Sequence, residues 1–94
     1  MSEPICIRVV IRGRVQGVYY RAWTVGAAKE RGLTGWVRNR SDGSVEAVLC
    51  GPAERVEDML EACKEGPPSA RVADIERAAH DDPPPAGFRK LDTV

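Results

Sequence analysis

The stretch "ICIRVVIR", residues 5–12, places a branched aliphatic residue at every second position: Ile5, Ile7, Val9 and Ile11. A period of two and a high β-branched content predict a β-strand with one buried face. The chain has 94 residues, which leaves room for one small domain with a thin core. We therefore expect the strand to pack into a compact two-layer fold, with a single domain over residues 1–94.

Two helices and a central hairpin are expected next. The first helix covers about residues 21–31 and stops at Gly32, a residue type that commonly follows the last helical turn. Residues 34–51 contain two short strands joined by a turn at Asp42-Gly43. The second helix begins after Gly51-Pro52, and its apolar residues follow the spacing of a core-facing helix: Val56, Met59, Leu60 and Cys63.

The last third of the chain predicts a further strand over residues 70–78, although Val72 and Ile75 do not alternate strictly. Residues 80–87 contain three consecutive prolines, so we expect a loop there. Residues 88–94 are a candidate for a short edge strand. The order βαββαβ, with this optional fifth strand, is that of an α+β ferredoxin-like two-layer sandwich. In that fold two helices cover one face of a mainly antiparallel sheet.

Charge and hydropathy exclude several classes of protein. Lys and Arg balance Asp and Glu at 14 each, and this zero net charge argues against a general binder of nucleic acid or membrane surfaces. No signal peptide is visible, and no run approaches the ~18 apolar residues of a membrane-spanning helix. We expect a cytoplasmic protein. Residues 1–47 hold eight Lys or Arg against four Asp or Glu, which hints at an anion site in that half.

The three cysteines, Cys6, Cys50 and Cys63, form an odd set without Cys-x-x-Cys spacing. This pattern indicates neither a disulfide framework nor a zinc site. We expect reduced thiols that pack as small hydrophobic side chains. No metal or cofactor is expected.

Residues 13–21, "GRVQGVYYR", connect the first strand to the first helix. Gly13 and Gly17 allow positive φ angles, and successive N–H groups in such a loop can form an anion-binding concavity. The helix N-terminus and the Arg21 guanidinium would add positive charge, which suits one phosphoryl group. The loop matches neither the Walker nor the dinucleotide-binding pattern. On spacing alone, a tight turn with a solvated arginine explains it equally well.

This loop and a second segment, "GWVRNRSDGSVE" at residues 35–46, together resemble the acylphosphatase family, and the resemblance extends to "GPPSARV" at residues 66–72. It implies a ferredoxin-like enzyme that hydrolyses the carboxyl–phosphate bond of small acyl phosphates without a metal or cofactor. It implies that the Arg21 side chain binds the phosphate and that Asn39 positions the attacking water. The same resemblance assigns backbone contacts with the phosphate to six residues: Gln16, Gly17, Val18, Tyr19, Tyr20 and Arg21. Many family members have Phe where this chain has Tyr20.

The residue types fit this chemistry. A simple carboxylic acid has a pKa of about 4, so the leaving carboxylate departs without a general acid. Phosphoryl transfer passes through a loose transition state, so positioning and charge stabilisation supply most of the catalysis. An asparagine amide both donates and accepts hydrogen bonds, which is enough to orient a water. Without the resemblance, Asn39 would more simply support the turn through its side chain.

Other residues receive structural interpretations. We predict packing for the aromatic side chains Tyr19, Tyr20, Trp23 and Trp36, and solvation for Arg38, Arg40 and His80. Two other functions stay open. One is a non-catalytic module that binds a phosphate-bearing partner such as RNA, although the aromatic signature of RNA-recognition domains is absent. The other is a domain that serves a larger carbamoyl-transfer enzyme. We expect a monomer.

Overall fold

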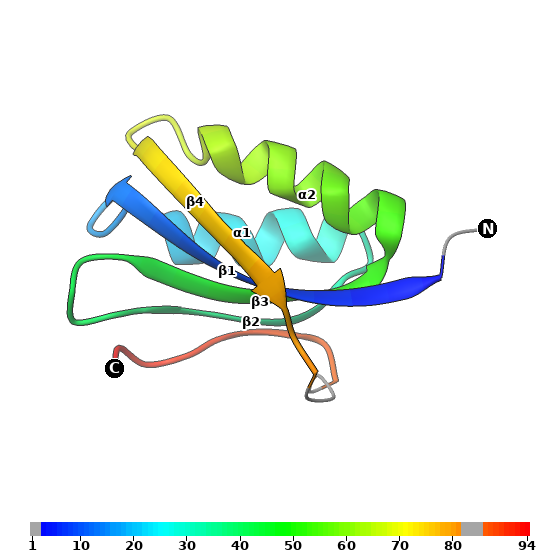
Figure 1. Cartoon of the computed structure of the whole chain (residues 1–94). Helices are drawn as coiled ribbons and strands as arrows, with labels where there is room; N and C mark the ends of the chain where they lie inside the picture. Colours follow the sequence, from blue (N-terminus) through cyan, green and yellow to red (C-terminus); the bar gives the residue numbers. More distant parts are fainter. Residues whose placement is uncertain (1–2, 82–85) are drawn as a thin grey trace.

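The computed structural model describes residues 3–81 and 86–94, and their elements form two layers (Figure 1). The elements are β1 (Pro4–Arg14), α1 (Tyr20–Glu30), β2 (Thr34–Asn39), β3 (Val45–Pro52), α2 (Ala53–Glu65), β4 (Arg71–Ala79) and β5 (Phe88–Lys90). Both helices lie on one face of a sheet with the strand order β4-β1-β3-β2-β5 (Figure 1). Neighbouring strands are antiparallel except β2 and β5, which are parallel. The predicted ferredoxin-like sandwich is confirmed, and the optional fifth strand is present. The predicted loop over residues 80–87 lies partly outside the described residues.

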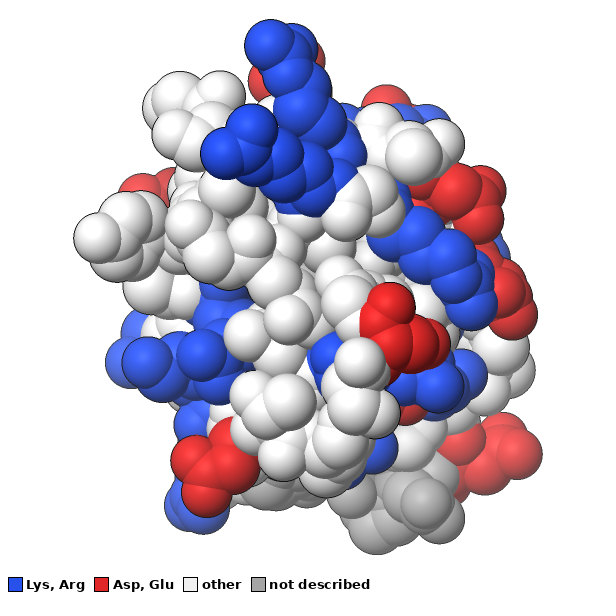
Figure 2. Space-filling view, turned by 90° about the vertical axis from the view of Figure 1, so that its left-hand side faces the viewer, with Lys and Arg blue, Asp and Glu red and all other residues white. Residues whose placement is uncertain are grey.

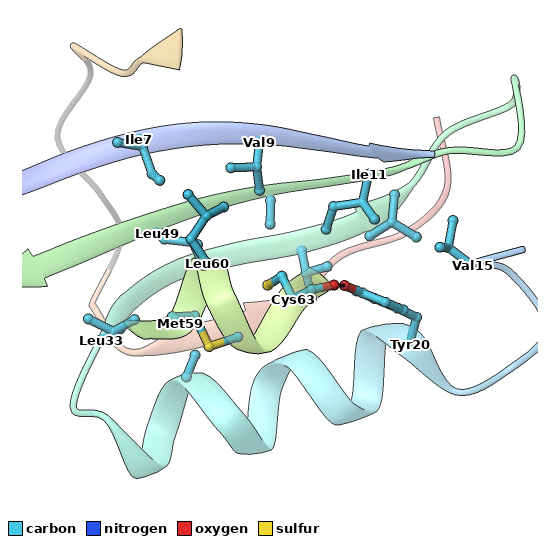
Figure 3. Packing of buried hydrophobic residues seen from close by; sticks show 14 of the residues in the cluster. Ile7, Val9, Ile11, Val15, Tyr20, Leu33, Leu49, Met59, Leu60 and Cys63 are labelled. Atoms are coloured by element: carbon cyan, nitrogen blue, oxygen red, sulfur yellow. Dashed lines mark hydrogen bonds between the residues drawn. The ribbon is translucent and has the colours of Figure 1, made fainter. Parts of the chain in front are cut away.

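The core lies between the sheet and the helices (Figure 3). The alternating residues of β1 and the predicted stripe of α2 are buried against one another, with Val9, Ile11, Met59 and Cys63 fully inaccessible. The Tyr20 ring is also buried, and its hydroxyl donates to the Cys63 carbonyl oxygen at 2.5 Å. This hydrogen bond connects the start of α1 to the end of α2. The hydroxyl that distinguishes Tyr20 from a phenylalanine therefore has a partner. Burial raises the pKa of Tyr20, which keeps the phenol neutral.

A β-bulge explains why the fourth strand does not alternate. Gly13 pairs with Val72 and Arg12 pairs with Asp74, so the register shifts between Arg12 and Gly13. The bulge allows both Val72 and Ile75 to pack against the core. Gly13 has φ 128°, and a Cβ there would overlap the Arg71 carbonyl oxygen, so only glycine fits. Gly13 therefore belongs to β1 and shapes the strand pairing rather than the loop.

The helix-free face of the sheet carries an ion-pair cluster around the buried Glu46. Arg8 and Arg38 both donate to the carboxylate of Glu46, Arg38 at 2.7 Å. Burial alone would raise the pKa of Glu46, but the hydrogen bonds from Arg38 and Arg8 outweigh it and lower that pKa. Arg38 also lies 4.7 Å above the centre of the Trp36 ring. The prediction of a solvated Arg38 is therefore wrong, and Trp36 packs on the open face rather than between the layers.

The cysteine prediction is wrong for two of the three residues. Cys6 of β1 and Cys50 of β3 are cross-strand partners with Cα atoms 4.1 Å apart, and they form a disulfide. The sequence conceals this pairing because it depends on the β1–β3 register across 44 residues. Cys63 is a buried free thiol, as predicted, and burial raises its pKa to about 11.

Replacing both Cys6 and Cys50 by alanine should lower the free energy of unfolding by about 4 kcal/mol, the loop-closure value for a loop of this length. Urea titration followed by circular dichroism measures the loss. Dithiothreitol serves as the matched control, since it should lower the urea midpoint of the wild type and leave that of the double variant unchanged. If dithiothreitol left the urea midpoint of the wild type unchanged, the disulfide would not be stabilising.

Candidate active site

The connection from β1 to α1 has the backbone of an anion-binding loop. Gly17 has φ 74°, and Tyr19, at the N-cap of α1, has φ 64° and ψ 24° in the left-handed region. Among the described residues, Tyr19 is the single non-glycine residue with a positive φ. Alternation of right- and left-handed residues turns successive N–H groups toward one side. The prediction of a packed Tyr19 is wrong, because the side chain is 85% exposed.

The N–H groups of this loop have no acceptor within the described part of the chain. The Tyr19 side chain makes no capping hydrogen bond, and the helical bonding starts with Trp23 N–H donating to the Tyr19 carbonyl oxygen at 3.0 Å. Among the described residues, no backbone N–H of residues 16–21 donates a hydrogen bond to a backbone carbonyl oxygen. These donors and the positive end of α1 together favour an anion at this point.

Arg21 lies on the first turn of α1 and is oriented by the C-terminal segment. Its Nη1 donates to the Leu91 carbonyl oxygen at 3.1 Å, and the Leu91 N–H donates to the Val37 carbonyl oxygen at 2.8 Å. The segment after β5 thus fixes the guanidinium against β2. Within the described chain Arg21 has no carboxylate partner, so its charge is available to a ligand.

Gln16 clamps the loop to the turn between β2 and β3. Its side-chain amide donates to the carbonyl oxygens of Arg40 and Ser44, each at 2.8 Å. The turn itself is held by Asp42, whose Oδ1 accepts from the Ser44 N–H at 2.9 Å and from the Ser44 hydroxyl. These two hydrogen bonds lower the pKa of Asp42. Gln16 therefore holds the loop and the end of β2 in fixed relation.

Asn39 is the last residue of β2, and its side chain takes no part in holding the turn. Its carbonyl oxygen accepts from the Val94 N–H at 3.1 Å, while its side-chain amide has no hydrogen bond to any described residue. The interpretation of Asn39 as a turn-supporting side chain is not supported, because Asp42 and Gln16 perform that task. The Asn39 amide remains free to contact a water or a ligand.

One cavity of about 400 Å³ brings these parts together. It is lined by Val15, Gly17, Tyr19, Tyr20, Arg21, Ala22, Asn39 and Lys90. Four of the six residues predicted to contact phosphate line this cavity, and Gln16 and Val18 do not. Val18 is buried in the core, and the Gln16 side chain is hydrogen-bonded to the turn between β2 and β3. The lining contains two cations and no carboxylate. Figure 2 looks onto this end of the molecule, where basic side chains and some acidic ones surround a largely uncharged centre.

Lys90 is the charged lining residue that the sequence did not single out. It shares its side of β5 with the buried Phe88, because successive strand residues alternate faces. The pairing of Lys90 with Val37 brings it beside β2. The sequence could have suggested that Phe88 and Lys90 share one face of a strand. Only the parallel pairing of β2 and β5 shows that this face of Lys90 lies at the cavity.

Two further features of the described residues bear on the class of protein. Within residues 3–81 and 86–94, no three His, Cys, Asp or Glu side chains are grouped so that they could hold a metal ion. In the same ranges no helix is long and apolar enough to cross a membrane. The fold defines a ferredoxin-like domain, and the cavity at the N-terminus of its first helix is lined by the loop and by two cations.

Comparison with known proteins identifies the family. A sequence profile described as acylphosphatase matches residues 7–90. An acylphosphatase of Azorhizobium caulinodans is 56% identical over 94% of this chain and 96% of its own length, and one of Rhizorhabdus wittichii is 51% identical over 98% and 93%. The solved structure of an acylphosphatase from Coxiella burnetii superimposes with a TM-score of 0.89, at 38% identity, over 94% of this chain and 93% of that one. The chain belongs to the acylphosphatase family and is an enzyme of that kind.

Proposed function

We propose that this cavity holds the phosphoryl group of a small acyl phosphate while Asn39 positions the water that attacks it. The observation that carries the proposal is the shared cavity, which is lined by the loop, by Arg21 and by Asn39. The overall reaction converts an acyl phosphate and water into a carboxylate and phosphate.

Phosphate binding is assigned to the loop and to Arg21. The N–H groups of residues 16–21 have no described acceptor, and the Arg21 guanidinium has no described carboxylate partner. Together they can contact the equatorial oxygens, over which charge spreads in the transition state. Lys90 adds a second positive charge to the same cavity, which strengthens its attraction for a dianion.

The attacking water is assigned to Asn39. Its amide can accept a hydrogen bond from the water and donate one to a phosphate oxygen, which orients the lone pair toward phosphorus. The water oxygen forms a bond to phosphorus as the bond from phosphorus to the acyl oxygen breaks. The carboxylate leaves with that electron pair, and the protons of the water pass to the phosphate product or to solvent. The cavity lining holds no Asp, Glu, His or Cys, and this chemistry requires none.

The wild type should release phosphate from acetyl phosphate at an undiminished rate in an excess of ethylenediaminetetraacetate, because no step uses a metal. The same preparation should act on phenyl phosphate at least about a thousandfold more slowly, since a phenolate is a poorer leaving group than a carboxylate. A coupled enzymatic assay for phosphate at neutral pH measures both rates, because acid molybdate would itself hydrolyse acetyl phosphate. Loss of acetyl phosphate turnover in the chelator would overturn the metal-free mechanism.

The remaining parts of the proposal concern the protein as a whole. We infer one domain over residues 1–94, a monomer, and a site that takes neither a cofactor nor nucleic acid. The match of the acylphosphatase profile to residues 7–90 supports a single domain. A cytoplasmic location also stays a prediction. The Cys6–Cys50 disulfide removes one of its supports, because disulfides are uncommon in that compartment.

A further inference from the structure

We propose that the Tyr19 ring forms an acyl-group subsite at the mouth of the phosphate cavity and favours acyl phosphates with an aromatic acyl group. This inference rests on the proposed function, since it concerns the part of the substrate that the phosphate loop does not bind. Three independent observations carry it: the backbone conformation of Tyr19, its exposure and its position.

The backbone conformation gives no reason for a tyrosine at position 19. The residue sits at φ 64° and ψ 24°, where a side chain with a Cβ is disfavoured and glycine or asparagine is the usual choice. The loop needs this conformation to turn its N–H groups inward, and either of those residues would provide it with less strain. Strained residues of this kind concentrate at functional sites.

Packing gives no reason for the ring either. Tyr19 is 85% exposed, whereas the adjacent Tyr20 is buried and hydrogen-bonded to Cys63. Within the described residues the Tyr19 ring has no aromatic partner, and its hydroxyl has no hydrogen bond. Folding therefore draws little stability from this side chain, which is free to pack against a ligand.

Position supplies the reason. Tyr19 lines the same cavity as Arg21 and Asn39, and the volume of about 400 Å³ exceeds the need of one phosphoryl group. Pockets that hold whole small molecules begin at roughly 300 Å³. The exposed Ala22 lines the same cavity and adds a small apolar surface to it. A flat aromatic acyl group would cover the exposed ring and gain both apolar burial and an aromatic contact.

The test compares benzoyl phosphate with acetyl phosphate for the wild type, Tyr19→Asn and Tyr19→Phe. Both substrates use the same phosphate loop, so a change in the loop itself cancels in the ratio of their kcat/KM values. Tyr19→Asn should lower the benzoyl-to-acetyl ratio about fivefold to tenfold, mainly through the KM for benzoyl phosphate. Tyr19→Phe keeps the ring and should keep the ratio. Tyr19→Asn should also raise Tm by about 5 °C, because asparagine tolerates the left-handed conformation.

Each outcome bears on the subsite. A ratio that stays constant in Tyr19→Asn overturns the proposal, even if Tm rises as expected. A ratio that falls equally in Tyr19→Phe also overturns it, because the hydroxyl rather than the ring would then be responsible. If the wild type hydrolyses neither substrate, the proposed function fails and the subsite fails with it. If the wild type hydrolyses both and the ratio does not move, the subsite alone is wrong.

Discussion

The substitution Arg21→Ala should lower kcat/KM for acetyl phosphate by about a thousandfold or more. Arg21 supplies the guanidinium of the described cavity, and an arginine that stabilises a transferring phosphoryl group is worth about 10³ to 10⁵ in rate. The substitution should also raise the inhibition constant of inorganic phosphate, because the bound product contacts the same guanidinium as the transition state. Steady-state kinetics with phosphate as a competitive inhibitor measures both effects.

Two further variants separate the charge of Arg21 from its geometry. Arg21→Lys keeps the positive charge but lacks the planar pair of donors. A lysine cannot bind the Leu91 carbonyl oxygen and contact two phosphate oxygens in the same way, so the activity should fall between those of the wild type and Arg21→Ala. Arg14→Ala is the matched control. Arg14 is an exposed arginine at the end of β1, outside the cavity lining, and its loss should change kcat/KM less than about threefold. If Arg21→Ala left the inhibition by phosphate unchanged, the assigned anchor would be wrong.

The sequence predicted the fold well because its strands and helices carry different periodicities. The alternation in β1 and the helical spacing in α2 each identify a buried face, and the two faces form one core. What it could not show depends on registers between distant residues. The bulge opposite Gly13, the Cys6–Cys50 disulfide and the burial of Glu46 between two arginines all arise from pairings across the sheet.

The candidate site was predictable only in part, for a related reason. Arg21 and Asn39 were identified through segments that resemble a known family, and the structure brings both to one cavity. Lys90 was missed because its place depends on the parallel pairing of β5 with β2. The clamp from Gln16 to the turn was missed because it crosses 24 to 28 residues of chain. Contacts between separate loops leave no periodic signal in a sequence.

The substitution Asn39→Ala should lower kcat by about a hundredfold to a thousandfold, with a much smaller change in KM. Asn39 is assigned to the water rather than to the phosphate, so its loss removes an interaction that acts chiefly in the transition state. Inhibition by inorganic phosphate should therefore stay within about threefold of the wild type, in contrast to Arg21→Ala. Steady-state kinetics with acetyl phosphate gives kcat and KM, and the inhibition constant comes from the same experiment.

Stability distinguishes this role from a purely structural one. The Asn39 side chain has no hydrogen bond to a described residue, so Asn39→Ala should change the free energy of unfolding by less than about 0.5 kcal/mol. Asp42→Ala is the matched control from the same turn. It removes the acceptor for the Ser44 N–H and hydroxyl, so it should destabilise the fold more and impair kcat less than Asn39→Ala. If Asn39→Ala unfolded in less urea than Asp42→Ala while keeping full activity, Asn39 would be a support for the turn. The attacking water would then need another partner in the cavity.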